Sequence, residues 1–375
     1  TVCDSLIELA PAITAIRKRT PAVLTSQDHV FSFTTPLRAM DLLTQGLLGA
    51  TMAQSGAKQQ ETRLATGIGF FAGIVADADI LIQSSNDPLL NIEFHRHFTH
   101  SLFFVPLGAL IAALLLWPFL RKRLPFPRLY LFALLGYCLS GVLDAFTSYG
   151  THLLWPLSDA RVAWNTISVI DPVFTLILLV TVVIAFRKYA HTAARIGLLL
   201  AAVYMSFGWM QLQRAEALAE TVIAGRGHHA EALLVKPTLA NLVLWRSIYE
   251  FEGRLYVDAI RAGLFSEPRV YQGESIEKFV LERDLSTLPA SSVLAADIAR
   301  FSHFSAGLLA IRPEQPNVLV DVRYSNLPMT LIPLWGIEIN PEQPDQHAKY
   351  MLYRDSSSTT REKFMALLLG EHILD

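Results

Sequence analysis

The chain has 375 residues and a net charge of only −2 at pH 7, and 52% of its residues are hydrophobic against 17% charged. Its mean hydropathy is +0.36, which is unusual for a water-soluble protein of this size and indicates membrane segments. No basic tract exceeds three residues, so the charge pattern excludes a dedicated nucleic-acid surface and no nucleic-acid partner is expected.

Apolar residues are unevenly distributed and predict three regions. Residues 1–39 lack an apolar run long enough to span a bilayer and are expected to form a loosely structured extension. Residues 40–212 hold the apolar runs and predict a transmembrane helical domain, whereas residues 213–375 have the mixed composition of a soluble domain. The expected fold is a mainly α membrane protein, a polytopic helical bundle of about five or six membrane segments followed by a small soluble α+β domain.

Helical membrane spans need about 20 apolar residues. Two weaker segments come first in the chain, at 42–57 and 64–83, and the second ends in Asp77 and Asp79, which predicts that its helix ends near Ala76. The stronger spans are predicted at 101–120, 129–149, 167–186 and 195–212.

The basic residues in the loops 121–128 and 187–195 place these loops in the cytoplasm by the positive-inside rule. The same rule places the polar helix ends and the C-terminal domain outside it. We therefore expect a multi-pass protein of a bacterial-type cytoplasmic (inner) membrane, with an extracytoplasmic C-terminal domain.

Several ionisable side chains gather at the helix ends that face this outer side. Charged groups at membrane depth cost a few kcal/mol each, so they usually pair, line a cavity or bind something. Carboxylates and imidazoles together suit zinc, manganese or iron, and the two cysteines form no CxxC motif. Metal or substrate chemistry, or an ion-pair network with Arg96 and Arg161, would account for the set Asp77, Asp79, His95, His100 and Asp144.

Other polar or small residues favour plainer interpretations. His97 is expected to be a solvent or interface histidine. For His152, such a role and a role in the site are about equally expected. His228 and His229 are expected in a solvated loop. Close helix packing rather than a phosphate loop explains the small residues Gly67, Gly69 and Gly73.

Five motifs follow one another in the order MDLLTQGLLGA from Met40, DAD at 77–79, HRHFTHS at 95–101, DAFTSYGTHLLWPLSDARVAW from Asp144, and ISVIDP ending at Pro172. In this order they resemble the YdjM-like family of membrane-bound proteins predicted to be metal-dependent hydrolases. The resemblance extends to about residue 260 through NLVLWRSIYEFEGRLYV.

The resemblance implies an inner-membrane hydrolase with a divalent metal, zinc or alternatively manganese. Its implied metal ligands are Asp77, Asp79, His95, His100 and Asp144. The implied catalytic residues are Asp79, His100, Arg96 and Thr99, of which Arg96 and Thr99 orient a substrate anion.

The chain departs from the family pattern at three positions. Many members carry His, Pro and Gln where this chain has Gln45, Ala76 and His152. The first departure weakens Gln45 as a ligand, and the last supplies an extra imidazole.

The soluble half shows strand-like patterns. A hairpin is predicted from 242–251 and 255–260, and further strands at 318–324 and 331–339. Helices are predicted at 211–224, 275–283 and 360–372. Such a domain could cover the membrane site as a lid or bind a partner.

The leading hypothesis is a metal-dependent hydrolase in which metal-activated water attacks an ester or phosphoester, with membrane lipids or a lipid-linked small molecule as substrate. An ion-coupled transporter that uses the same Asp and His side chains is the alternative. A non-catalytic membrane scaffold with a partner-binding soluble domain is a third.

Overall fold

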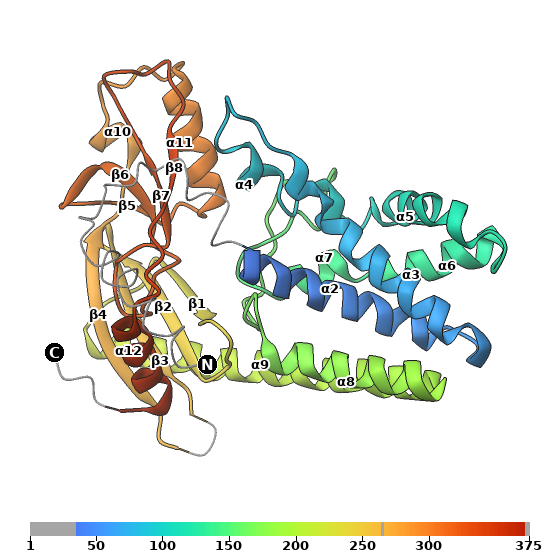
Figure 1. The fold of residues 1–375 in the computed structure, drawn as a ribbon. Coiled ribbons are helices and arrows are strands. Elements are labelled where there is room, and N and C mark those ends of the chain that lie inside the picture. The colour runs from blue at the N-terminus through green and yellow to red at the C-terminus, as the bar shows by residue number, and fades with distance from the viewer. Residues whose placement is uncertain (1–34, 264–265, 372–375) are drawn as a thin grey trace, which may run out of the picture. The chain divides into compact units, whose positions relative to one another are not determined.

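The computed structural model describes residues 35–263 and 266–371, with side chains from residue 42 onward. The extension predicted for 1–39 therefore lies almost entirely outside the described residues, as does Cys3. The chain divides into units 1–40 and 41–375, and the second unit contains the elements discussed below (Figure 1).

Helices make up the first part of the described chain. Several are short, and these short elements carry most of the polar residues singled out above. The longer helices are α2 (Thr35–Ser55), α3 (Thr62–Val75), α5 (Val105–Leu120), α6 (Phe126–Tyr137), α8 (Pro172–Lys188) and α9 (His191–Gly225), and the short ones are η3 (Gln59–Glu61), η4 (Ala76–Leu81), α4 (Leu90–Phe94), η5 (Phe98–His100) and α7 (Ser140–Ala145).

The prediction of five or six membrane segments was too high for the described residues. Three helical stretches are long and apolar enough to cross a membrane, Gln59–Leu81, Phe126–Ala145 and His191–Gly225. A fourth is added if Leu90–His100 and Val105–Leu120, which are bent by 92° at their junction, count as one broken span. Helices α5 and α8 have only 16 and 17 residues, or about 25 Å at 1.5 Å per residue, less than the roughly 30 Å of a hydrocarbon core.

Large apolar side chains are exposed along the outer faces of three helices. Soluble proteins rarely expose contiguous apolar surface of this extent, whereas lipid covers it in a membrane. The chain is therefore a membrane protein on structural grounds as well as by composition. Exposed examples are Leu107, Leu115 and Phe119 on α5, Leu176 and Val180 on α8, and Leu199, Val203 and Trp209 on α9.

Helices α2, α3 and α6 approach one another at glycines. A Cβ atom on Gly136 would lie 2.6 Å from the carbonyl oxygen of Gly69, and a Cβ on Gly49 would overlap the same oxygen. Gly73 packs equally closely against the α2 backbone, whereas Gly67 has open space around it. The packing prediction is thus confirmed for Gly69 and Gly73 and wrong for Gly67.

Helix α9 is continuous over 35 residues, about 50 Å at 1.5 Å per residue. The predicted span at 195–212 and the predicted helix at 211–224 are therefore one element. It lies beside α8 and runs on to the first strand of the C-terminal domain (Figure 1).

The C-terminal domain contains two four-stranded antiparallel sheets, in the orders β1-β2-β3-β4 and β5-β6-β7-β8. The predicted α+β class is confirmed. The strands are β1 (Ala232–Pro237), β2 (Leu244–Phe251), β3 (Arg254–Arg261), β4 (Arg269–Glu277), β5 (Leu309–Arg312), β6 (Gln315–Asp321), β7 (Trp335–Glu338) and β8 (Lys349–Leu352), and the helices are α10 (Leu281–Asp284), α11 (Val293–Phe304) and α12 (Ser358–Leu369).

The predicted hairpin is strands β2 and β3, in which Phe251 pairs with Arg254. Its two turn residues, Glu252 and Gly253, have φ of 49° and 70°, the left-handed pair that a tight hairpin turn requires. The helix predicted at 360–372 corresponds to α12. The helix predicted at 275–283 was wrong, because Arg269–Glu277 pairs with β3 as an edge strand and only four residues of α10 follow.

Lys236 is buried in this domain, 6% exposed, with its Nζ atom 3.2 Å from the centre of the Tyr324 ring. Burial, reinforced by the charges of Arg323 and Arg246, lowers the pKa of Lys236 well below its ordinary value. At pH values between this lowered pKa and the ordinary lysine pKa of about 10.4, the unfolded chain therefore binds one proton more than the folded chain. Folding stability should therefore rise with pH in this window, by up to about 1.4 kcal/mol per pH unit.

Thermal unfolding of the detergent-solubilised protein between about pH 7 and about pH 9.5 tests this expectation. As the pH rises, wild type should gain stability relative to Lys236→Met, which has no titrating amine at this position. At neutral pH, Lys236→Met should be the more stable protein. A difference between the two proteins that does not change with pH would contradict the assignment.

Candidate metal centre

The two aspartates of the DAD motif lie on η4, a tight 3-10 turn that follows α3 directly. The prediction that the helix ends near Ala76 is confirmed, since α3 ends at Val75. Residues two apart on a turn with three residues per turn point about 120° apart. This arrangement lets both carboxylates reach the His100 ring, with Asp77 Oδ1 3.3 Å from Nε2 and Asp79 Oδ2 3.4 Å from Nδ1.

Asp77, His100 and Asp144, here called the central cluster, converge from η4, η5 and α7. Asp144 Oδ2 lies 3.0 Å from His100 Nε2, and one ligand atom from each of the three residues lies within 4.8 Å of the others. Their exposed fractions are 5%, 1% and 1%. Two carboxylates and one imidazole are therefore held together out of water.

The central cluster fits a divalent transition ion. Donor atoms that each lie about 2.0–2.2 Å from an ion are roughly 3.0–3.5 Å from one another, and the distances of Asp77 and Asp144 from His100 Nε2, 3.3 and 3.0 Å, fall in this range. Asp77 Oδ2 is also buried without a hydrogen-bond partner in the described structure, whereas His100 Nε2 and Asp144 Oδ2 lie at ion-pair distance from each other. A buried oxygen like Asp77 Oδ2 is costly unless something binds it.

Asp79 takes a different position from the central cluster. Its Oδ2 accepts hydrogen bonds from the Arg96 backbone N–H and from Thr99 Oγ1, both at 2.8 Å. Its Oδ1 lies 3.0 Å from His95 Nδ1. Thr99 Oγ1 lies 3.0 Å from His100 Nδ1. Asp79 and Thr99 together therefore hold the His100 ring so that its Nε2 faces Asp77 and Asp144. Metal-binding histidines are commonly oriented in this way by a partner on the other ring nitrogen.

Arg96 is 1% exposed, with a φ of 62°. Its Nε lies 3.1 Å from Asp144 Oδ2, and its Nη1 donates to Thr147 Oγ1 at 3.0 Å. The guanidinium therefore lies beside the central cluster and offsets part of its negative charge. The left-handed backbone at Arg96 turns its N–H toward Asp79, which explains how one residue contacts both carboxylates.

Gly141 and Tyr137 position His100, and sequence reasoning missed both. A Cβ atom on Gly141 would overlap the carbonyl oxygen of His100, so only glycine lets α7 approach η5 this closely. Tyr137 donates from its hydroxyl to the carbonyl oxygen of Thr99 at 2.7 Å. The available sequence signal was the pair Ser140 and Gly141 shortly before Asp144. Small residues of this kind allow close backbone contact.

The remaining predicted residues lie at the edge of the site or away from it. His95 contacts Asp79 but does not join the central cluster. Arg161 donates to the carbonyl oxygens of Tyr149 and Gly150. Asp171 caps α8, accepting from the backbone N–H groups of the first helical turn.

Gln45 donates from Nε2 to Asp144 Oδ1 at 2.8 Å. Gln45→Ala should leave this buried carboxylate oxygen without its amide donor and lower the free energy of unfolding by about 1–3 kcal/mol. Gln45→His, which can still donate, should lose less, and Gln213→Ala on the exposed face of α9 should change little. Thermal unfolding in detergent checks the ranking, and equal midpoints for wild type and Gln45→Ala would contradict it.

The hollow beside the central cluster is small. It has a volume of about 10 Å³ and is lined by Asp144, Thr147 and Asp171 among others, which is room for about one water molecule. One water molecule therefore fits beside Asp144 in this conformation, whereas a larger substrate requires surrounding segments to move.

A second acidic group, Asp87, Asp297 and His347, also brings three potential ligand atoms within 4.8 Å. Its carboxylates are already occupied, because Arg300 pairs with Asp87 at 2.9 Å and with Asp297 at 3.1 Å. His347 Nδ1 lies 2.9 Å from the other Asp297 oxygen. This group is an ion-pair network that holds α11 against the 84–93 segment.

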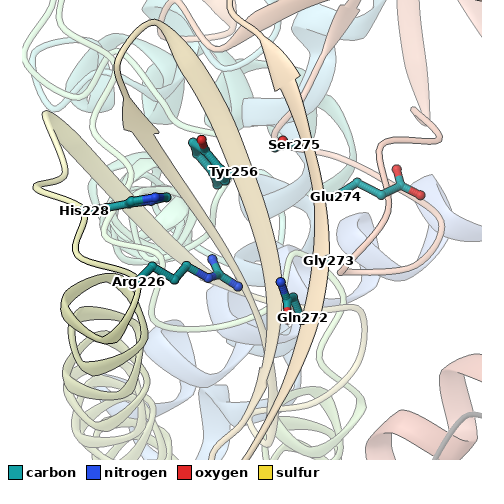
Figure 2. A pocket seen from close by; sticks show the side chains of 7 residues that line it. All are labelled: Arg226, His228, Tyr256, Gln272, Gly273, Glu274 and Ser275. Atoms are coloured by element: carbon teal, nitrogen blue, oxygen red, sulfur yellow. The ribbon is translucent and has the colours of Figure 1, made fainter.

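A hollow of about 390 Å³ lies in the C-terminal domain, away from the central cluster. Figure 2 shows Arg226 pointing toward Gln272 across this hollow, with His228 and Tyr256 above. Arg226 is bound by both oxygens of Asp258, at 2.7 and 2.8 Å. His228 and His229 lie in a loop, as predicted, and His229 is exposed, whereas His228 is half-buried and stacks on Phe251 with ring centres 4.3 Å apart.

Comparisons with known proteins agree with the motif pattern. Residues 40–215 match the family model described as YdjM inner membrane protein. The uncharacterised protein YfhP of Bacillus subtilis (strain 168) is 28% identical over 165 residues, 44% of this chain, and the chain spans about half, 49%, of that relative's length. No solved structure matches the chain. The matched residues 40–215 contain the whole central cluster, so this part of the chain is similar to the YdjM inner membrane protein family.

Proposed function

We propose that this protein is a membrane-bound, metal-dependent hydrolase that cleaves an ester or phosphoester at the membrane surface. The observation that carries the proposal is the convergence of the buried Asp77, His100 and Asp144 side chains, in which Asp77 Oδ2 has no hydrogen-bond partner. The donor set suits zinc, with manganese as the alternative. A divalent ion held there would act as a Lewis acid and make water acidic enough to attack near neutral pH.

The chain's own residues have separate roles in this proposal. Asp77 keeps one buried oxygen, Oδ2, without a hydrogen-bond partner, and this oxygen is placed to accept the proton of the attacking water. Arg96, whose Nε is 3.1 Å from Asp144, favours the negative charge that develops on the substrate. Asp79 and Thr99 are positioning residues that act through His100.

Exposed apolar side chains beside the site support a lipid substrate. Leu81 ends η4 and is 79% exposed, Phe103 is 54% exposed, and Leu157 is 77% exposed. The loop that carries Leu157 is joined to the segment after His100 by the bond from Leu102 N to Leu153 O at 3.0 Å. These three side chains belong to segments that meet next to the central cluster, where an acyl chain would place its headgroup ester near the metal ligands.

The C-terminal domain is proposed to lie outside the cytoplasm, because the basic loops 121–128 and 187–195 favour the cytoplasmic side. Its contacts with the membrane domain support a covering role. Tyr324 donates to the carbonyl oxygen of Ser148 at 2.8 Å, and α11 binds the segment that leads to His95 through Arg300. We propose that this domain limits access to the site.

The test is an activity screen on protein reconstituted into phospholipid vesicles. Wild type supplied with zinc or manganese should cleave a lipid carboxylester or phosphoester, and chelation should stop the reaction. Asp144→Asn should be inactive. Asp258→Asn is the matched control, because it also alters a buried aspartate, but one that binds Arg226 in the C-terminal domain away from the central cluster, and it should remain active.

Two outcomes would count against the proposal. Cleavage that survives in Asp144→Asn would place the chemistry elsewhere. Proton-coupled uptake into vesicles, with no cleavage of any lipid ester by metal-loaded wild type, would instead favour the transporter alternative, since buried Asp and His side chains also form proton paths.

A further inference from the structure

Three histidines from distant parts of the chain lie close together beside the site, and the proposed function uses none of them. His97 precedes η5, His152 belongs to the loop after α7, and His303 is on α11 of the C-terminal domain. The ring centres of His97 and His152 are 4.4 Å apart, and those of His152 and His303 are 6.3 Å apart. These three side chains are called the histidine group.

Two of the ring nitrogens in this group are buried and lack a hydrogen-bond partner within the described structure. They are Nδ1 of His97 and Nδ1 of His152, and His152 as a whole is only 5% exposed. His97 also packs against Trp155, with ring centres 5.6 Å apart. Ring packing alone accounts for the contact but leaves two buried nitrogen atoms unsatisfied, which is costly.

We propose that His97, His152 and His303 form a second metal site, separate from the central cluster, that takes a transition ion with a preference for imidazole. Imidazole nitrogens suit zinc, copper and nickel, whereas magnesium and calcium prefer oxygen. His303 is exposed, so a rotation of its side chain toward the half-buried His97 ring and the buried His152 ring would displace little of the surrounding structure.

The state of His152 agrees with this role. Burial, reinforced by the charge of Arg161, lowers the pKa of His152 to about 3. Its ring is therefore neutral near pH 7 and offers a lone pair to a metal, as a ligating histidine must.

An ion in the histidine group would join the two domains at the edge of the catalytic site. His303 is on α11, the helix that also carries Arg300, and Arg300 Nη2 binds Asp87 Oδ2 at 2.9 Å. The ion would thus reinforce an existing contact between α11 and the membrane domain. It would be a structural ion, since its ligands are not those of the central cluster.

The experiment is a titration of metal-free, detergent-purified full-length protein with zinc, followed by calorimetry and by metal analysis after gel filtration. Wild type should bind two zinc ions per chain. His303→Ala and His152→Gln should each bind one, and His229→Ala, which removes an exposed histidine elsewhere, should bind two. The Asp77→Asn/Asp144→Asn double variant should retain the ion of the histidine group. Magnesium should not compete for this ion.

The variants also separate the two sites. If the central cluster binds no metal, wild type should bind one zinc ion, and His303→Ala should bind none. That result would contradict the proposed function and still support the metal site of the histidine group. Because His303 is exposed, its replacement should not impair folding, and thermal unfolding checks this. Equal zinc binding by wild type, His303→Ala and His152→Gln would overturn the second site.

Discussion

His100→Ala is expected to abolish hydrolysis, with a fall in kcat/KM of about 10³-fold or more, because the variant loses the imidazole ligand of the ion. The His100 ring contacts all three aspartates of the site, Asp77, Asp79 and Asp144. Its removal would also leave buried carboxylates facing one another without an intervening base or metal ligand.

The assay compares wild type, His100→Ala and His228→Ala in the same vesicles with the same lipid substrate. His228→Ala is the matched control, since it removes a packed histidine of the C-terminal domain that contacts Tyr249 rather than the site. It should retain activity. Activity of His100→Ala within a few fold of wild type would contradict the role given to this residue.

Gly141→Ala is expected to be the most damaging small substitution in the helical domain. A Cβ atom at this position overlaps the His100 carbonyl oxygen, which is backbone and cannot rotate away. Helix α7 or η5 must then shift, at a cost of about 3 kcal/mol or more. A shift of about 1 Å would also separate Asp144 from His100, and both metal binding and activity should fall together.

Gly67→Ala provides the control for this substitution. Gly67 is also a helical glycine, on α3, but a Cβ there meets no atom within 4 Å, so alanine should be neutral or should stabilise the helix by up to about 1 kcal/mol. Thermal unfolding in detergent compares the two variants with wild type. A midpoint for Gly141→Ala as high as that for Gly67→Ala would show that the close approach of α7 and η5 is not required.

Local sequence patterns predicted the elements whose signals are short-range. The end of α3 before Asp77, the β2–β3 hairpin around Gly253, and α12 all carry such signals, and all are found in the structure. The number of spans was wrong because α5 and α8, with 16 and 17 residues, are shorter than the spans predicted at 101–120 and 167–186. The helix predicted at 275–283 failed because pairing with β3, a contact between distant residues, determined the structure of this segment.

The candidate site was only partly accessible to sequence reasoning. Motif order indicated which aspartates and histidines to consider, but not that Asp77 and Asp144 would meet His100 Nε2 while Asp79 would hold Nδ1. That distinction depends on a 3-10 turn and on the approach of α7 to η5, which Gly141 permits. The proximity of His303 to His152 could not be predicted at all, because it depends on how α11 packs against the membrane domain.

The most direct test of the central claim is the metal content of protein purified in mild detergent and measured by mass spectrometry, after extensive dialysis, for wild type and Asp77→Asn. Both proteins should retain the ion of the histidine group, so the difference between them reports the central cluster alone. Wild type should contain about one more zinc or manganese ion per chain than the variant. Equal metal content in two well-folded proteins would contradict a metal centre at Asp77, His100 and Asp144.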